Sequence, residues 1–476
     1  MTEKVQHKSA NKKDKRGGTK RNFGMICFAY ICAFTSLQAV SSLQSSINTD
    51  KDVGLNSVAI AGAASLVTCL LFTTPLGYIF GYKWAIVGGQ FGIMVYVASN
   101  MYPKQWLMYS TAIICGSLRA CMSMAQSSYV TVLANDESEN DDAEIKTRKY
   151  FGIFLAAYQS AQIWGNLISY LVLRNTPKST NTNFTQCGAD YLTSEHQMQD
   201  DNRQLISQKT IYILYSIFSG IIFVSIVLTI IILVQRRDNK KEDDSQGLLR
   251  ESLNHTLSTL KTAINPNHLV LIPLGFWSVS AQIFFMGAFS SSFITCTIGV
   301  QYVGLIMTIY GIAATITSIV VAYIVKLKYS RPICFLIAAL LSYTISIIML
   351  VWKPTVSQTY VLFIIPFLSS ISDALTTPFI TALYNSMLPN KISEAYSLLT
   401  CAQNSGAIIV FLYISKLRIR TQIILELVYV TLAMLSYIII AIKQRRTSTN
   451  DDDQQIFVLN KIVLGPSKHV VSSDQF

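Results

Sequence analysis

Two oppositely charged side chains lie inside apolar segments of this chain, where an isolated charge is costly. Arg119 is near the middle of the segment 105–131, and Asp373 is near the middle of the segment 359–385. An ionisable residue at membrane depth is rare unless it is paired, hydrated or functional. Three interpretations are open: an ion pair between the two side chains, a cavity that binds a solute or an ion, and separate local hydrogen bonds.

A second polar group lies on one uncharged apolar stretch, Tyr150–Leu173, which contains the amides of Gln159, Gln162 and Asn166. Amides without hydrogen-bond partners are costly in lipid, so they should face protein or a wet cavity. These three residues are candidates for the polar lining of a cavity. They equally fit hydrogen bonds to neighbouring helices.

Two further residues bear on whether these segments contain a functional site. Pro378 follows Asp373 and should kink or break its helix, which is one sequence feature of transporter sites. Glu426 lies nearer one end of the segment 420–442, and we expect it to reach the membrane interface by snorkelling.

No catalytic signature accompanies these residues. The sequence has no Gly-rich nucleotide loop, no zinc-ligand spacing and no nucleophile paired with a base. We therefore predict a protein that is not an enzyme, with no cofactor and no catalytic metal. The same absence argues against an ATP-driven pump.

Long apolar segments must position the charged and amide side chains. The 476 residues are 51% hydrophobic and only 13% charged, whereas soluble domains average roughly 25% charged residues. A helix that crosses a hydrocarbon core of ~30 Å needs about 20 apolar residues. The predicted spans are 23–43, 56–79, 84–101, 105–131, 150–173, 209–234, 269–297, 301–325, 331–352, 359–385, 395–416 and 420–442.

The distribution of Lys and Arg predicts the orientation of these spans. Most of the 38 basic residues fall on one side, which the positive-inside rule assigns to the cytosol together with both termini. The net charge of +12 thus reflects membrane topology and does not indicate a nucleic-acid partner. Three basic residues are exceptions to this rule, because they fall on the outer side: Lys416, Arg418 and Arg420.

The spans divide into two sets of six. We predict an all-α polytopic membrane protein with twelve transmembrane helices in two six-helix halves, an arrangement similar to that of the major facilitator superfamily. The predicted regions are a disordered cytosolic tail (1–22), an N-terminal half (23–234), a cytosolic central loop (235–268), a C-terminal half (269–442) and a cytosolic tail (443–476).

The predicted outer loop, 174–208, carries two residues of interest. Asn183 begins the sequon Asn-Phe-Thr on the side where N-glycosylation occurs. Cys187 is the one cysteine of nine outside the predicted spans. Since no extracellular partner is evident in the chain, we predict a free thiol, with a bond between chains as the alternative.

The stretch Arg148–Leu173 closely resembles the fifth-span signature of the Unc-ninety-three family, an ion-channel regulatory branch of the major facilitator superfamily. Weaker resemblances follow in the same order along the chain, and the whole is closest to the A-type branch. They comprise Leu43-Gln-Ser-Ser-Ile-Asn48, Gly81-Tyr-Lys83, Tyr96, Asn100, Ala125-Gln126, Tyr129-Val-Thr131, Ser372-Asp-Ala374 and Glu394-Ala-Tyr-Ser397. The chain departs from the family at Ser123 and at Thr376-Thr-Pro378.

The resemblance implies a protein that acts through another membrane protein. One branch of the family regulates a two-pore potassium channel complex, and another escorts Toll-like receptors from the endoplasmic reticulum. It transfers no ligand-binding residue, because none is agreed in the family. We expect a lipid-embedded regulator or escort of a channel or receptor, in the plasma membrane by default and in an endomembrane as the alternative. A secondary transporter of a small organic solute or ion is the second hypothesis, and a purely structural membrane component is the third.

Overall fold

A computed structural model describes almost all of the apolar part of the chain. The described residues are 2–47, 53–71, 73–137, 143–175, 187–192, 206–235, 257–258, 261–262, 264–324, 330–387 and 392–463. Their regular structure is helical throughout. Apolar segments in a bilayer form helices because every backbone N–H and C=O group must find its partner within the segment.

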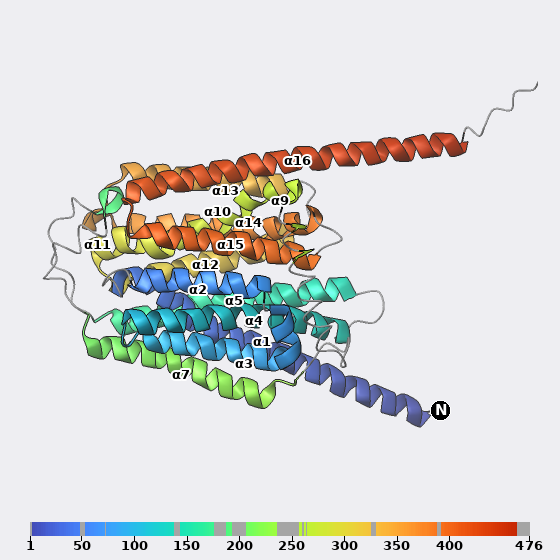
Figure 1. Ribbon diagram of the computed structural model, residues 1–476, viewed down its shortest axis with the longest axis horizontal. Coiled ribbons are helices and arrows are strands. Elements are labelled where there is room, and N and C mark those ends of the chain that lie inside the picture. Colours follow the sequence, from blue (N-terminus) through green and yellow to red (C-terminus); the bar gives the residue numbers. More distant parts are fainter. Residues whose placement is uncertain are drawn as a thin grey trace, which may run out of the picture.

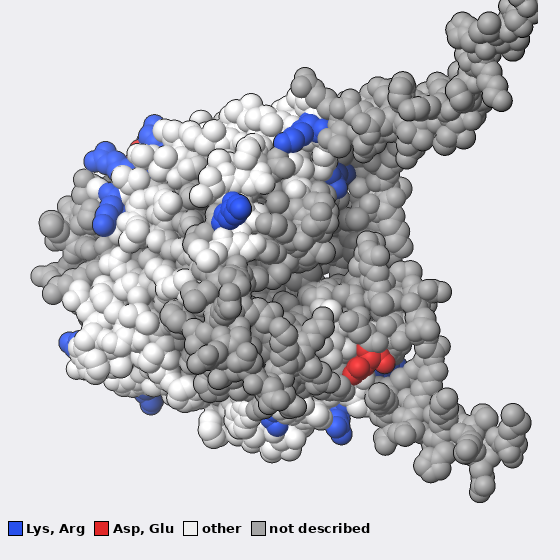
Figure 2. Space-filling model, turned by 45° about the vertical axis from the view of Figure 1, so that its right-hand side comes forward, with Lys and Arg blue, Asp and Glu red and all other residues white. Residues whose placement is uncertain are grey.

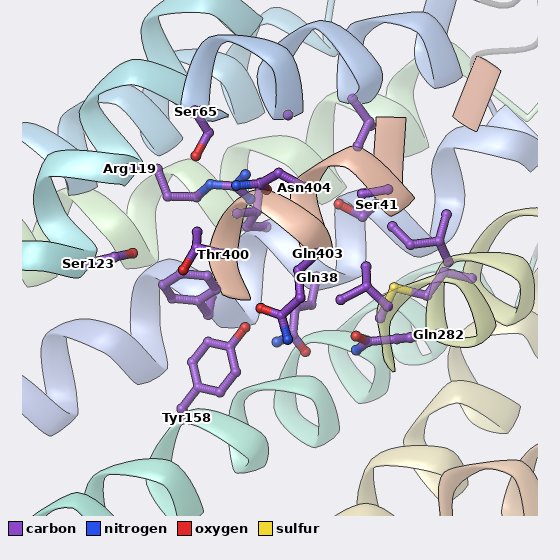
Figure 3. Close-up of a pocket in the computed structure, with 18 of the residues that line it drawn as sticks. Gln38, Ser41, Ser65, Arg119, Ser123, Tyr158, Gln282, Thr400, Gln403 and Asn404 are labelled. Carbon is purple, nitrogen blue, oxygen red and sulfur yellow. The ribbon is translucent and has the colours of Figure 1, made fainter. Parts of the chain in front are cut away.

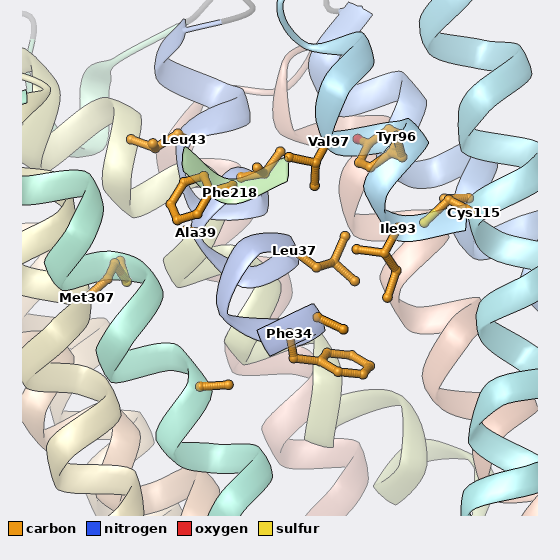
Figure 4. Packing of buried hydrophobic residues seen from close by; sticks show 14 of the residues in the cluster. Phe34, Leu37, Ala39, Leu43, Ile93, Tyr96, Val97, Cys115, Phe218 and Met307 are labelled. Atoms are coloured by element: carbon orange, nitrogen blue, oxygen red, sulfur yellow. The ribbon is translucent and has the colours of Figure 1, made fainter. Parts of the chain in front are cut away.

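Helices of the first half occupy one layer, the lower one in Figure 1. Their packing buries a continuous apolar core around α1, part of which Figure 4 shows with Leu37, Leu43 and Phe218. The helices are α1 (Thr2–Ile47), α2 (Val53–Leu71), α3 (Thr73–Ser99), α4 (Gln105–Glu137), α5 (Ala143–Leu173) and α7 (Gln208–Ile232).

The second half forms the upper layer in Figure 1. Its first span is composite, because a π-helical segment interrupts it: α10 (Ile272–Phe284), η4 (Phe285–Thr295) and α11 (Cys296–Ile298) follow one another. The short α9 (Pro266–Leu269) precedes it. The remaining elements are α12 (Gln301–Ile324), α13 (Ser330–Val351), η5 (Val356–Gln358), α14 (Thr359–Met387), α15 (Ile392–Ile414) and α16 (Ile419–Val463).

The two halves repeat one packing pattern. In the first half α1 packs on α5 and α7, and α4 packs on α2 and α3. In the second half α10 packs on α15 and α16, and α14 packs on α12 and α13, which are the corresponding helices. The halves meet where α5 packs on α12 and where α2 packs on α15. Since α5 corresponds to α15 and α2 corresponds to α12, each of these two contacts is the counterpart of the other. The arrangement is that of a two-fold repeated bundle.

Of the helices within the described residues, nine are long and apolar enough, by length and composition alone, to cross a membrane. The other three helices at predicted span positions are α3, α5 and α15. Figure 2 shows that the described part of the surface on the side in view carries few Lys, Arg, Asp and Glu side chains. In α3 the backbone turns at Gly81, where φ is 68°, a conformation that glycine adopts without steric cost. The predicted span 56–79 therefore differs from the structure: α2 ends at Leu71, and α3 already begins at Thr73.

Two further predictions concern the extent of helices. The helix α14 continues through Pro366 and Pro378, so of the predicted kink or break at Pro378 the break does not occur. Helix also extends into both predicted tails, since α1 begins at Thr2 and α16 ends at Val463. A span that is already helical supplies the nucleus, and the Lys, Gln and Ala residues that adjoin it propagate the helix.

The prediction of a free thiol at Cys187 is wrong. Cys187 forms a disulfide with Cys296, with 5.7 Å between the two Cα atoms. Cys296 falls within the predicted span 269–297, but close to its end, because it begins α11, the last turn of that span. We call the end of the bundle that holds this bond the disulfide end, at the left of Figure 1.

Candidate functional site

A cavity of about 420 Å³ lies between the two halves. Ligand sites commonly occupy clefts of roughly 300–1,000 Å³, so the volume suits a small organic molecule. Helices α1, α2, α4 and α5 line it from the first half, and α10, η4 and α15 line it from the second. Its polar lining residues include Gln38, Ser41, Ser65, Arg119, Ser123, Gln126, Tyr158, Gln282, Thr400, Gln403 and Asn404.

Helix periodicity places Arg119 in this cavity. Arg119, Ser123 and Gln126 follow one another at intervals of four and three residues, so they share one face of α4. An adjacent face holds Gly116, where an added Cβ would lie 2.1 Å from the carbonyl oxygen of Ala61 on α2. Because this glycine lets α4 approach α2 so closely, Arg119 can reach across to α15. Figure 3 shows its side chain extending into the cavity toward Asn404.

Within the described residues, the Arg119 guanidinium has neither an ion-pair partner nor a hydrogen bond. It is the one side chain with a formal charge among the residues that line the cavity in the described structure. The ion pair with Asp373, one of the three open interpretations, is not formed among these residues. Arg119 and Asp373 instead occupy different surroundings.

Asp373 is engaged within the second half. The Tyr310 hydroxyl of α12 donates a hydrogen bond to its carboxylate, and Ser370 of the same helix α14 donates to the carbonyl oxygen of Tyr310 at 2.6 Å. Asp373 does not appear among the residues that line the cavity. The described geometry therefore corresponds to a local hydrogen bond between α12 and α14.

The three amides of α5 lie outside the described cavity lining as well. Gln162 and Asn166 are buried, and the Asn166 amide donates to the Gln162 carbonyl oxygen at 2.9 Å. Gln159 is half-buried. An added Cβ on Gly304 of α12 would lie 2.5 Å from the Asn166 carbonyl oxygen. The Asn166 backbone thus lies at the crossing of α5 and α12, one of the contacts between the halves.

Glu426 is a buried carboxylate that the sequence analysis placed wrongly. Its side chain is 6% exposed and does not reach an interface. Ser280 of α10 donates to its Oε2 atom at 3.2 Å, while its Oε1 atom has no hydrogen-bond partner in the described structure. The position along α16 suggested an exposed end, but α10 packs over this turn.

Family-matching residues of the first half form hydrogen-bond networks at its two ends. At the disulfide end, the buried Gln44 amide donates to the Asn100 side chain at 2.7 Å and to the Tyr96 hydroxyl at 3.3 Å. Ser57 of α2 shares a 2.8 Å hydrogen bond with the same hydroxyl. This network joins α1, α2 and α3.

At the opposite end, the network holds the C-terminus of α7. Lys83 donates to the Ile230 carbonyl oxygen at 2.7 Å, and the Tyr129 hydroxyl donates to that of Val234 at 2.6 Å. A cation at a helix C-terminus is stabilised by the helix dipole. The residues of these two networks therefore hold helices together and do not line the cavity, whereas Gln126, Phe154 and Tyr158 of the family-matching stretches do.

The disulfide end of the cavity is closed between α1 and η4. Ser45 and Ser290 share a hydrogen bond of 3.1 Å, and Ser46 and Thr295 share one of 2.9 Å. Phe289 and Phe293 of η4 are fully buried beside them and stack on each other. The sequence does not reveal the π-helical segment that brings these rings and hydroxyls to one face.

A short segment of the chain between α5 and α7 lies against the second half at this end. We call residues 187–192, which lie between α5 and α7 in the chain, the strap. The strap is fixed to the second half by the Cys187–Cys296 disulfide, by a 3.2 Å hydrogen bond from the Ile419 amide to the Tyr191 carbonyl oxygen, and by an Asp190–Arg420 ion pair of 3.0 Å. The predicted glycosylation site, Asn183, lies outside the described residues.

Comparison with known sequences identifies the family. The sequence model described as "Ion channel regulatory protein UNC-93" matches residues 45–440. This chain belongs to the UNC-93 family. A similar relative, protein unc-93 homolog A from Xenopus laevis, is 26% identical over 88% of this chain and 92% of its own length. The human protein of the same name is 25% identical over 88% and 92%. A Caenorhabditis elegans relative, whose name assigns it to potassium channel regulation, is 20% identical over 91% of this chain and 63% of its own length.

Solved structures show the fold of this UNC-93 family member to be that of the major facilitator superfamily. The nucleoside transporter NupG is similar with a TM-score of 0.56 and 12% identity over 87% of this chain and 99% of the transporter. A D-xylose–proton symporter is similar with a TM-score of 0.55 and 13% identity over 89% and 96%. At this identity the likeness concerns the fold alone.

Proposed function

We propose that this UNC-93 family member regulates or escorts a partner membrane protein, with a potassium channel as the first candidate. The family match over residues 45–440 carries the proposal, and the name of the Caenorhabditis elegans relative supplies the candidate partner. The disulfide end supports it further. The Cys187–Cys296 bond ties the chain between α5 and α7 covalently to the second half, and Ser45 and Ser46 bond to η4 beside it. These links oppose the separation of the halves that alternating access requires at this end.

The proposed orientation has both termini in the cytosol and the disulfide end outside. Disulfides persist in oxidising compartments, and the bond lies at the end that the positive-inside rule assigns to the outside. Arg420, one of the basic residues that disagreed with this rule, pairs with Asp190 on that side. We propose the plasma membrane as its location, with an endomembrane as the alternative, and glycosylation at Asn183.

Affinity purification from cross-linked cells tests the main proposal. The tagged full-length chain should co-purify a channel or receptor that an unrelated tagged membrane protein of similar size does not enrich. Co-expression with the enriched channel should then change its current density or its amount at the cell surface. Purification without any enriched membrane protein, or an enriched channel with unchanged current and delivery, would contradict the proposal.

A secondary transporter of a small organic solute is the second candidate, and the cavity favours it. A polar cavity between two repeated halves, with one unpaired cation on α4, is a suitable place for a solute. Uptake into vesicles that contain the purified protein tests this function. Uptake that is lost in Arg119→Gln would support transport, and background uptake for every solute offered would count against it.

A further inference from the structure

We propose that the cavity binds a small organic oxyanion with an apolar, aromatic body, and that Arg119 binds its carboxylate or phosphate group. This inference deepens the second candidate function, and it rests on that function only in placing a solute in the cavity. Four observations carry the proposal: the charge of the cavity, its unpaired amides, its aromatic wall and its size.

The charge of the cavity selects the sign of the ligand. Among the lining residues of the described structure, the positive charge of Arg119 is compensated by no carboxylate. A guanidinium at membrane depth without a partner is costly. An oxyanion removes that cost and accepts two parallel hydrogen bonds from the planar guanidinium, a geometry that suits carboxylates and phosphates. A cationic solute would instead add a second uncompensated charge.

Unpaired amides supply hydrogen-bonding groups for the rest of the ligand. Gln38 is 7% exposed and its Oε1 atom has no partner in the described structure. Gln126 is 6% exposed and its Nε2 atom is likewise without a partner there. Buried amide atoms are normally satisfied. Both side chains line the cavity, and Figure 3 shows Gln38 close to Gln403 and to the Tyr158 hydroxyl.

An aromatic wall forms the apolar side of the site. Tyr30 stacks on Phe34 with 5.4 Å between ring centroids, Phe154 meets Tyr30 edge-on at 4.8 Å, and Tyr158 meets Phe34 edge-on at 4.8 Å. The Tyr30 hydroxyl is already engaged with the Met122 carbonyl oxygen at 2.9 Å. Aromatic faces and edges pack well against another flat ring. All four rings line the cavity from α1 and α5.

The size and position of the cavity limit the ligand. A volume of about 420 Å³ is at the small end of the range for organic ligands, so it suits one ring with a short acidic side chain and excludes a phospholipid with two acyl chains. Residues from both halves line the site, so a ligand that binds there contacts both halves at once. Its affinity therefore depends on their relative position.

Equilibrium binding to the purified full-length protein in detergent tests the inference. Hydrocinnamate, its neutral counterpart hydrocinnamamide, phenyl phosphate and acetate are compared by their effect on thermal unfolding. We expect stabilisation by hydrocinnamate or phenyl phosphate, or both, that rises with concentration, and much weaker effects from the neutral amide and from acetate, which lacks a ring. The head group that stabilises more identifies the oxyanion as a carboxylate or a phosphate.

Two variants locate the binding at Arg119. Arg119→Gln should weaken binding at least tenfold, in keeping with the loss of a charge-assisted hydrogen bond. Arg119→Lys keeps the charge but loses the planar fork, so it should give an intermediate affinity and also remains informative if the Gln variant does not fold. Arg331→Gln removes an arginine of α13 that donates to Gln444 outside the cavity lining, and it should bind as the wild type does.

Three results would overturn the inference: no stabilisation by either aromatic oxyanion at millimolar concentration, equal stabilisation by the neutral amide, or unchanged affinity in both Arg119 variants. The measurement does not depend on transport. Oxyanion binding without uptake would therefore refute the transporter hypothesis and support the proposed binding site. Uptake without oxyanion binding would support transport and refute the proposed binding site.

Discussion

Gly165 of α5 lies against the backbone carbonyl group of Thr35 on α1, so closely that an added Cβ would come within 2.0 Å of the carbonyl oxygen. Small residues allow membrane helices to approach in this way and to gain packing energy that lipid cannot supply. Gly165 belongs to the family-matching stretch Tyr150–Leu173. Of the two glycines in this stretch, Gly165 therefore fixes the crossing of α5 and α1.

Gly165→Ala should destabilise the protein by at least ~1–3 kcal/mol, since overpacking against a backbone atom forces the helices apart. We expect a lower apparent Tm in detergent and reduced delivery to the cell surface. Gly152→Ala on the same helix is the matched control, because an added Cβ there meets nothing within 4 Å. Equal behaviour of the two variants would show that the close approach is unimportant.

Cleavage in the central loop should leave the two halves linked. We predict that a chain with a protease site inserted within 236–256 runs as one species on a denaturing gel without reductant and as two with it. Cys187→Ser and Cys296→Ser should each separate the halves under both conditions. Separation of the wild-type halves without reductant would show that the Cys187–Cys296 bond does not form.

Gln44→Leu should cost about 1–3 kcal/mol of stability, because it leaves the buried Asn100 side chain and the Tyr96 hydroxyl without a donor that they now share. Thermal unfolding of the purified protein measures the loss. Gln208→Leu makes the same substitution at an exposed position at the start of α7 and should change little. A Gln44 variant as stable as the Gln208 variant would rule out a stabilising role for the network.

Glu426→Gln should fold and unfold as the wild type does, or at a slightly higher temperature. The amide can keep the hydrogen bond with Ser280 and carries no charge into a buried site that lacks a described cationic partner. Glu426→Lys should prevent accumulation of folded protein, because it buries an uncompensated cation there. A strong loss of stability in the Gln variant would mean that the negative charge itself is required.

Periodicity and composition predicted the helices because lipid leaves the backbone no alternative to helix. The division of the spans into two sets of six predicted their arrangement as a major facilitator fold. Arg119 could be singled out because a charge in an apolar segment is costly unless it is paired, hydrated or functional. The structure places it in the cavity. The ion pair with Asp373, one of three interpretations left open, was considered because the two side chains carry opposite charges near the middle of their segments.

The surroundings of the other candidate residues could not be predicted, because they depend on contacts between segments that are distant in the sequence. Periodicity along one helix contains no information on such contacts. Asp373 lies beside Tyr310 because α12 and α14 pack together, and Glu426 is buried because α10 covers it. The amides of Gln162 and Asn166 resemble a cavity lining in sequence, yet they lie where α5 crosses its neighbours. The same chemistry suits either environment, so only the packing of the helices distinguishes them.

The strap also constrains the order in which the molecule can be completed. Cys187 and Cys296 are 109 positions apart in the sequence, and the segment between them includes α7 and most of the first span of the second half. A chain made from its N-terminus presents the first thiol long before its partner exists. Oxidation of this pair can occur only after α10 and η4 have been synthesised and have brought Cys296 to the disulfide end. The presence of the bond therefore indicates that the first span of the second half has reached its place.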